Sequence, residues 1–279
     1  MNAQTAVNKW KWLKTQQLQS EKSQSHLLCM VTRWLRFFLT SPLGKVAAAE
    51  VKAYEDQLEE GGMSNAALNR ERLFVRQFFR WAREHGWIDH DPSAGWGYRN
   101  EKVEREYAPL SRDAEGLLLY AAPTWLEHYI VFSICTGLRQ GTIRQLTWRH
   151  VKPMPGGEWF LEVPARLMKA RRPLRMPLSG AACGALACGH PGSTQPLVKL
   201  PSEPTKIYRE FKKAVAKAGI NPATTPHDLR RTWVQRMNEA GATLQQTMAL
   251  GGWSSPGTLL KHYFTPVQDD VARALLEKI

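Results

Sequence analysis

Hydrophobic residues recur every three or four positions through much of the N-terminal third of the chain. Over residues 26–39 this spacing is typical of a helix with one buried face. It continues over residues 46–58, and again over residues 64–86, where a Ser or Asn precedes the run and a Gly follows it. The pattern therefore predicts an all-helical domain over residues 1–98.

The apolar periodicity stops near Gly95, and charged residues cluster over residues 99–108. A stretch that combines many charges with no apolar face is typical of an exposed connection between domains. We therefore expect a linker at residues 99–108 and a second domain over residues 109–279.

The second domain mixes helical and strand patterns. Residues 129–135 form a continuous apolar run that predicts a buried helix, while residues 158–163 and 173–178 predict two strands around a basic hairpin at 166–172. Residues 180–200, rich in Gly, Ala and Pro, predict an irregular connection. Further helices are expected from a Ser111 cap, over 141–148, 204–218, 227–240 and 243–250, and from about 267. The predicted fold is mainly α with a small antiparallel β-sheet (α+β).

The charge of the chain indicates an anionic partner. Its net charge is +13 and its isoelectric point is about 9.8. Lys and Arg number 16 against 12 Asp and Glu over residues 1–105, and 22 against 13 over residues 106–279. Nucleic acid is the first candidate, with the second domain as the stronger phosphate binder.

Other classes of protein are disfavoured by the sequence. Because it contains no long apolar run and no signal-peptide pattern, we expect a soluble, cytoplasmic protein that does not bind a membrane. Its four cysteines are too sparse for a disulfide framework. Cys183, Cys188 and His190 lack a fourth ligand at a usual spacing, so no metal and no cofactor are expected.

Several short motifs carry groups that can handle phosphate. His227 precedes Arg230 by three residues, which places both on one face of a helix. Thr136-Gly-Leu-Arg139 lies upstream, and Gly251-Gly252-Trp253 and Tyr263 follow. A phosphodiester is broken by a nucleophile, a neutralising charge on the phosphate oxygens and a proton for the leaving oxygen. These motifs contain a candidate for each role.

In order and spacing, these motifs resemble the active site of tyrosine recombinases of the phage integrase family. The resemblance implies that two arginines grip the scissile phosphate, a histidine supports proton transfer, and a hairpin lysine protonates the departing oxygen. It also implies a ring N–H donor at the tryptophan and attack by the tyrosine, which forms a 3′-phosphotyrosine without ATP or metal. The catalytic candidates are Arg139, Arg230, His227, Lys169, Trp253 and Tyr263.

Arginines outside these motifs are candidates for contacts to DNA. Those on the helix predicted over residues 64–86 could form a solvated face, but on so basic a chain they could also line a phosphate backbone. This region resembles the helical core-binding domain of the family. The predicted DNA contacts are Arg70, Arg76, Arg80, Arg83, Arg171, Arg172 and Arg231.

Two positions depart from the family pattern. Thr142 stands where the family often has an acidic residue three positions after the first arginine, so Arg139 would lack a charged partner. Ten positions separate Trp253 from Tyr263, about one more than the family pattern, and Gly257 could absorb the difference. Both departures bear on whether the site is active.

Three functions remain open at this point. The leading hypothesis is a site-specific recombinase, an integrase of a phage or other mobile element, acting as a homotetramer on two DNA sites with accessory DNA-bending proteins. Alternatives are a DNA-binding protein on the same fold that no longer cleaves, and a type IB topoisomerase-like enzyme. The apolar stripe in residues 267–279 predicts a tail that docks on its own domain or on a neighbouring protomer.

Overall fold

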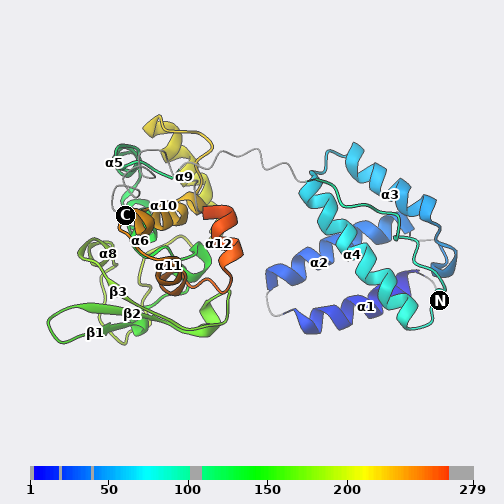
Figure 1. The fold of residues 1–279 in the computed structure, drawn as a ribbon, viewed down its shortest axis with the longest axis horizontal. Coiled ribbons are helices and arrows are strands. Elements are labelled where there is room, and N and C mark those ends of the chain that lie inside the picture. Colours follow the sequence, from blue (N-terminus) through cyan, green and yellow to red (C-terminus); the bar gives the residue numbers. More distant parts are fainter. Residues whose placement is uncertain (1–2, 19–20, 39–40, 101–108, 264–279) are drawn as a thin grey trace, which may run out of the picture. The chain divides into compact units, whose positions relative to one another are not determined.

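The computed structural model describes residues 3–18, 21–38, 41–100 and 109–263. The chain divides into two compact units, Met1–Arg105 and Glu106–Ile279 (Figure 1). Most of the predicted linker, from residue 101 to 108, lies outside the described residues, as does the predicted tail helix that begins near residue 267. Both therefore stay predictions.

The first unit consists of helices in its described part, as the periodicity predicts. Its four α-helices are α1 (Ala3–Gln17), α2 (Glu21–Phe38), α3 (Ala48–Glu60) and α4 (Asn65–Glu84), with a short 3-10 turn at Leu43–Lys45. The sequence patterns predict α2, α3 and α4 but not α1. The core is aromatic: the rings of Trp10 and Trp34 both meet Phe78 edge-on, with centroids 5.8 and 5.1 Å away. Such edge contacts add specificity to the burial of large rings.

One acidic side chain lies inside this helical unit. The Glu71 side chain is 1% exposed and accepts two hydrogen bonds from Arg33, at 3.0 and 3.1 Å. Its Oε1 also accepts from the Tyr54 hydroxyl at 2.7 Å. A buried carboxylate is tolerated when it is paired in this way. The network thereby joins α2, α3 and α4.

The second unit combines helices with a three-stranded antiparallel sheet. The strands are β1 (Val151–Pro153), β2 (Trp159–Val163) and β3 (Leu174–Leu178), in the order β1-β2-β3. Alternation along β3 buries Leu174, Met176 and Leu178 against the core and exposes the residues between them. The two predicted strands are confirmed. β1, which pairs with β2, was not predicted.

The helices of the second unit surround the buried α6, the apolar segment expected at residues 129–135 (Figure 1). Helix α10 packs against α6, and α5 packs against α9. The Ser111 cap is confirmed, since its hydroxyl accepts from the Ala114 amide at 3.1 Å. The α-helices are α5 (Arg112–Ala121), α6 (Thr124–Thr136), α7 (Gln140–Ile143), α8 (Gly180–Gly184), α9 (Pro204–Ala218), α10 (Pro226–Glu239), α11 (Leu244–Gly251) and α12 (Pro256–Tyr263).

Two further details differ from the sequence predictions. Helix α7 ends at Ile143, and a separate 3-10 turn at Trp148–His150 follows it. The connection expected to be irregular over residues 180–200 begins with α8, whose cap is Ser179.

The predicted class, mainly α with a small antiparallel sheet, is confirmed. In the part of the chain that the structure describes, no helix is long and apolar enough to cross a membrane.

Candidate active site

The end of α6 positions Arg139. Gly137 closes the helix in the left-handed region, with φ +63°, which glycine adopts without the strain of a side chain. A Cβ atom at Gly137 would lie 2.4 Å from the Trp233 ring, so the site also has no room for one. The chain then turns so that Arg139 caps α7 and lines a pocket.

Helix α10 begins with a tightly bonded cap. Asp228 accepts hydrogen bonds at 2.7 Å from both the amide and the hydroxyl of Thr225, and Pro226 occupies the first turn, where its missing N–H has no cost. This cap fixes the first turn, which carries His227. Arg230 follows one turn later on the same face.

Arg230 is held by the backbone and by an aromatic ring. Its Nη1 donates to the Gly137 carbonyl at 2.5 Å, and its Nη2 donates to the Gly251 carbonyl at 2.8 Å. The guanidinium carbon lies 3.5 Å from the centre of the Trp253 ring, within the range of a cation–π contact. With 2% of its surface exposed, Arg230 connects the ends of α6 and α11 to α10.

The environment of His227 favours its neutral form. Although the residue reaches solvent, the neighbouring chain partly desolvates its ring and lowers its pKa. The positive charges of Arg231 and Arg230, and more weakly that of Arg139, lower it further, while Asp228 opposes them. The resulting pKa is about 4, against an ordinary value of 6.5, so His227 is neutral at pH 7 and can accept a proton.

The β2–β3 loop presents Lys169 to the solvent. Next to it, Met168 is 3% exposed, and its Cε would be 2.1 Å from a Cβ placed on Gly252. The Met168 carbonyl accepts from the Arg171 amide at 3.0 Å, and Arg171 has a φ of +53°, which is unusual for a residue with a side chain. The loop is therefore a tight turn anchored by a buried methionine.

Thr142 connects this loop to α7. Its hydroxyl donates to the Leu167 carbonyl at 3.0 Å, and the residue is 5% exposed. The sequence indicates that Thr142 gives Arg139 no charged partner. In the structure the Thr142 hydroxyl bonds instead to a carbonyl two residues before Lys169. One hydrogen bond thus ties the segment that follows Arg139 to the loop that carries Lys169.

The Arg139 pocket, a cavity of about 200 Å³, brings three of the six catalytic candidates together: Arg139, Lys169 and Trp253. Arg230 stacks on Trp253, and His227 is close enough to both arginines to be affected by their charges. The sixth candidate, Tyr263, is the last residue of α12, and its side chain lies outside the described residues.

Sequence reasoning missed other parts of this site. Ser254 and Ser255 line the Arg139 pocket, and the carbonyls of Gly137 and Gly251 hold Arg230. The two serines follow Trp253 directly, so their place in the motif could have indicated them. The sequence cannot indicate which backbone carbonyls bind a side chain, because every residue has a carbonyl.

The predicted DNA contacts fall into two groups. Six are at least partly exposed: Arg70, Arg76, Arg80 and Arg83 on α4, and Arg171 and Arg172 in the β2–β3 loop. Arg231, by contrast, is 8% exposed and pairs with Asp228 at 2.5 Å. This arrangement favours a structural role for Arg231, since its charge is already used to hold the first turn of α10.

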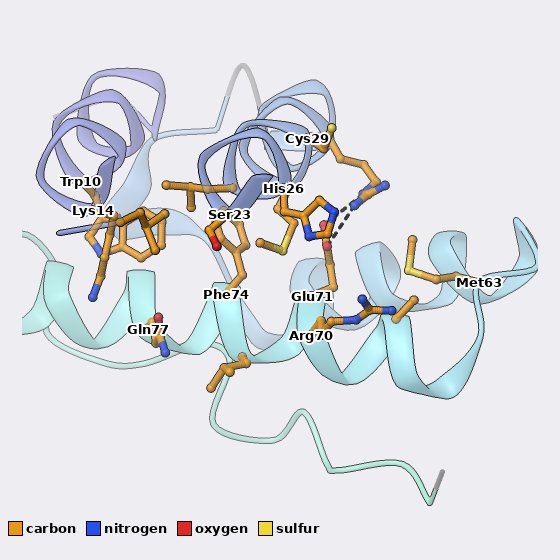
Figure 2. Close-up of a pocket in the computed structure, with 16 residues that line it drawn as sticks. Trp10, Lys14, Ser23, His26, Cys29, Met63, Arg70, Glu71, Phe74 and Gln77 are labelled. Atoms are coloured by element: carbon orange, nitrogen blue, oxygen red, sulfur yellow. Dashed lines mark hydrogen bonds and ion pairs between the residues drawn. The ribbon is translucent and has the colours of Figure 1, made fainter. Parts of the chain in front are cut away.

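The helical unit contains a further cavity that the sequence did not indicate. It measures about 430 Å³ and lies among α1, α2 and α4, with Trp10 and Phe74 in its apolar wall (Figure 2). The Arg33–Glu71 ion pair lies at one side of this cavity, where Figure 2 draws its two hydrogen bonds. Among the described residues, no cluster of His, Cys, Asp and Glu could hold a metal ion.

Comparison with known proteins identifies relatives. The family described as the phage integrase family matches residues 110–269. A curated integrase from Streptomyces ambofaciens is 28% identical over 178 residues, which cover 50% of this chain and 44% of that protein. The chain thus spans less than half the length of this relative.

Solved structures share the fold at low sequence identity. A lambda integrase dimer bound to a COC′ core site has a TM-score of 0.76 at 17% identity, covering 96% of this chain and 100% of that one. The Tn1549 transposon integrase in complex with a circular intermediate DNA has a TM-score of 0.74 at 17% identity, covering 100% of both. A lambda integrase tetramer bound to a Holliday junction has a TM-score of 0.75 at 16% identity, covering 96% of this chain and 80% of that one.

The low pKa of His227 gives a direct test of the site. In an NMR titration, His227 should titrate near pH 4, and bound inorganic phosphate should raise its pKa by stabilising the imidazolium. Because the unfolded chain takes up this proton near pH 6.5, His227 should reduce the stability of the fold as the pH falls from about 6.5 to 4. An ordinary pKa for His227, unchanged by phosphate, would contradict the described surroundings.

Proposed function

The chain belongs to the phage integrase family of tyrosine recombinases, and from this premise we propose that it is a site-specific DNA recombinase. The observation that carries the proposal is the pocket that joins Arg139, Lys169 and Trp253, with Arg230 stacked on the tryptophan. Within a cavity of about 200 Å³, these residues offer positive charge to bind a phosphate and a proton for the leaving group.

The arginines bind the scissile phosphate in this proposal. Arg139 lines the open pocket and takes one non-bridging oxygen, since a guanidinium stays charged and matches phosphate with paired N–H groups. Arg230 takes the second oxygen. Because Arg230 is 2% exposed and stacks on Trp253, this second contact requires a shift of the turn at 253–255 when DNA binds.

The bond changes then follow from the remaining residues. The Tyr263 hydroxyl oxygen attacks phosphorus and forms a 3′-phosphotyrosyl ester, and the P–O5′ bond breaks. His227, neutral at pH 7, accepts the tyrosine proton, and the Lys169 ammonium donates a proton to the departing O5′. Attack by a 5′-hydroxyl reverses these steps, so rejoining consumes no ATP.

The two units take separate roles in this proposal. The helical unit, residues 1–98, is a core-binding domain that contacts DNA through the exposed arginines of α4, and residues 109–279 form the catalytic domain. Structural relatives were solved as complexes with DNA, and one as a tetramer on a Holliday junction. By analogy we propose double-stranded DNA as the partner and a homotetramer on two sites. Accessory DNA-bending proteins and action in the cytoplasm at the nucleoid belong to the same proposal.

A second candidate is a protein on this fold that binds DNA without cleaving it. The burial of Arg230 favours it, because an arginine that stayed behind Trp253 could not neutralise a transition state. A third, a topoisomerase-like enzyme, would cleave DNA but would not exchange strands between two duplexes. A strand-exchange assay with two labelled duplexes separates it from a recombinase.

The Tyr263→Phe variant should bind target DNA as tightly as the parent and form no covalent adduct. The substitution keeps the ring but removes the attacking oxygen. The substrate is a duplex with a nick close to the crossover site, so that the cleaved 5′ fragment diffuses away. The parent should then accumulate a protein–DNA species that survives denaturant on a gel.

Matched variants define the outcome of this trapping assay. Arg139→Ala and Arg230→Ala should each reduce trapping by at least about a hundredfold, as for the loss of a transition-state donor. Lys217→Ala, an exposed change on α9, should have no effect. Adduct formation by Tyr263→Phe would assign the nucleophile to another residue. Absence of an adduct with the parent on its verified site would favour the binding-only candidate.

Thr142→Val should slow cleavage because it removes the hydrogen bond that holds the loop of Lys169, and Thr142→Ser, which keeps the hydroxyl, should cleave at the parent's rate. The critical measurement is the cleavage rate on a substrate with sulfur in place of O5′. A thiol has a pKa of about 8.5, so its thiolate leaves without a proton donor. On this substrate Thr142→Val and Lys169→Ala should both match the parent. If Thr142→Val stayed slow on the sulfur substrate, its defect would lie elsewhere in the site.

A further inference from the structure

A second cavity in the catalytic unit is lined in part by the same β2–β3 loop as the Arg139 pocket. It is an open cavity of about 630 Å³, here called the sheet pocket. Its walls come from the 3-10 turn before β1, from the outer face of the sheet and from the loop. The lining residues are Arg149, His150, Lys152, Glu162, Val163, Pro164, Arg166, Pro173, Leu174 and Arg175.

The sheet pocket concentrates positive charge. Four of its lining residues are Arg or Lys, and all four are exposed, whereas Glu162 is the only acidic residue among those described in its lining. The charges of Arg166, Lys152 and Arg149 reach His150 and lower its pKa, after the larger effect of burial. Like charges held this close repel one another, and an anion in the pocket relieves that repulsion.

The sheet holds one of these cations in a fixed position. Arg175 lies opposite Glu162 in the β2–β3 register, and its Nε is 3.5 Å from the Glu162 carboxylate. Its guanidinium also lies 4.7 Å from the centre of the Phe160 ring. Within the described residues, it is the only one of the four cations with an acidic partner. The charges of Arg149, Lys152 and Arg166 can therefore interact with an anion in the sheet pocket.

The loop relates the sheet pocket to the Arg139 pocket. Arg166 lines the former and Lys169 the latter. Three residues span at most about 11 Å even when fully extended, which is comparable to the ~12 Å width of the major groove. A duplex that places one phosphate beside Lys169 therefore brings other backbone phosphates within reach of Arg166.

We propose that the sheet pocket binds a backbone phosphate of the same duplex whose scissile phosphate enters the Arg139 pocket. This inference rests on the proposed function for the identity of the ligand. It adds Arg149, Lys152 and Arg166 to the predicted DNA contacts, and it gives Glu162 an opposing role. The contact is to the backbone, so it holds the duplex without reading its sequence.

The test measures binding of the full chain to a mixed-sequence duplex of about 30 base pairs over a range of salt concentrations. Each phosphate contact contributes about 0.9 to the slope of log K against log salt. Arg149→Gln combined with Lys152→Gln should reduce the slope by about one to two and weaken all duplexes alike. Glu162→Gln should strengthen binding, because it removes the opposing charge.

The controls separate charge from folding. Lys206→Gln combined with Lys217→Gln removes two exposed charges from α9 and should leave the slope unchanged. Arg149→Lys combined with Lys152→Arg keeps the charge and should bind like the parent. A parent-like slope in the Arg149/Lys152 glutamine variant, or no gain in Glu162→Gln, would overturn the proposal. Failure of Tyr263 to trap DNA would refute the chemistry alone, since the binding assay needs no cleavage.

Discussion

The hydrogen bonds from Arg230 to two backbone carbonyls hold the candidate active site together. The Gly137 carbonyl belongs to the end of α6, and the Gly251 carbonyl to the end of α11. The last carbonyls of a helix have no partner within it and carry partial negative charge, so a buried guanidinium satisfies both ends at once. Arg139 follows the first end, and Trp253 follows the second. The placement of both residues therefore depends on a single side chain from α10.

The opposite wall of the Arg139 pocket is built differently. Lys169 is carried by a loop whose attachment to the rest of the unit depends on side chains, through the Thr142 hydrogen bond and the burial of Met168. A single neutral hydrogen bond contributes about 1 kcal/mol. Arg230 is thus fixed by the ends of two helices, whereas Lys169 is carried by a loop that is held by a few weak contacts.

Local patterns predicted most of the fold because helices and hairpins are determined by nearby residues. The periodicity located α4 and α9 to within one or two residues, and the alternation located β2 and β3. What the sequence missed depends on contacts between distant residues. Strand β1 is three residues long and ends in a proline, so only its pairing with β2 defines it. Helix α1 is mostly polar, and its apolar residues do not form a clear helical pattern in the sequence. They are buried only because the rest of the helical unit packs over them.

The same limit applies to the site. The motifs selected three residues that line one pocket, Arg139, Lys169 and Trp253, because phosphate chemistry restricts which side chains are useful. Spacing could not show that Arg230 would be buried beneath Trp253, or that Arg231 would be paired with Asp228. It also could not show that the Thr142 hydroxyl would bond to the β2–β3 loop. These outcomes depend on how α6, α10 and the β2–β3 loop pack, which no single segment determines.

Because Arg230 is anchored on carbonyl oxygens, the sequence around it can change more freely than if side chains held it. A substitution replaces a side chain but leaves the carbonyl of that residue in place, so most positions around Arg230 can change without removing its acceptors. The two acceptor residues themselves are exceptions, since a Cβ atom would lie 2.4 Å from the Trp233 ring at Gly137 and 1.8 Å from the Trp253 ring at Gly251. A framework of this kind can therefore persist while most of the side chains around it change.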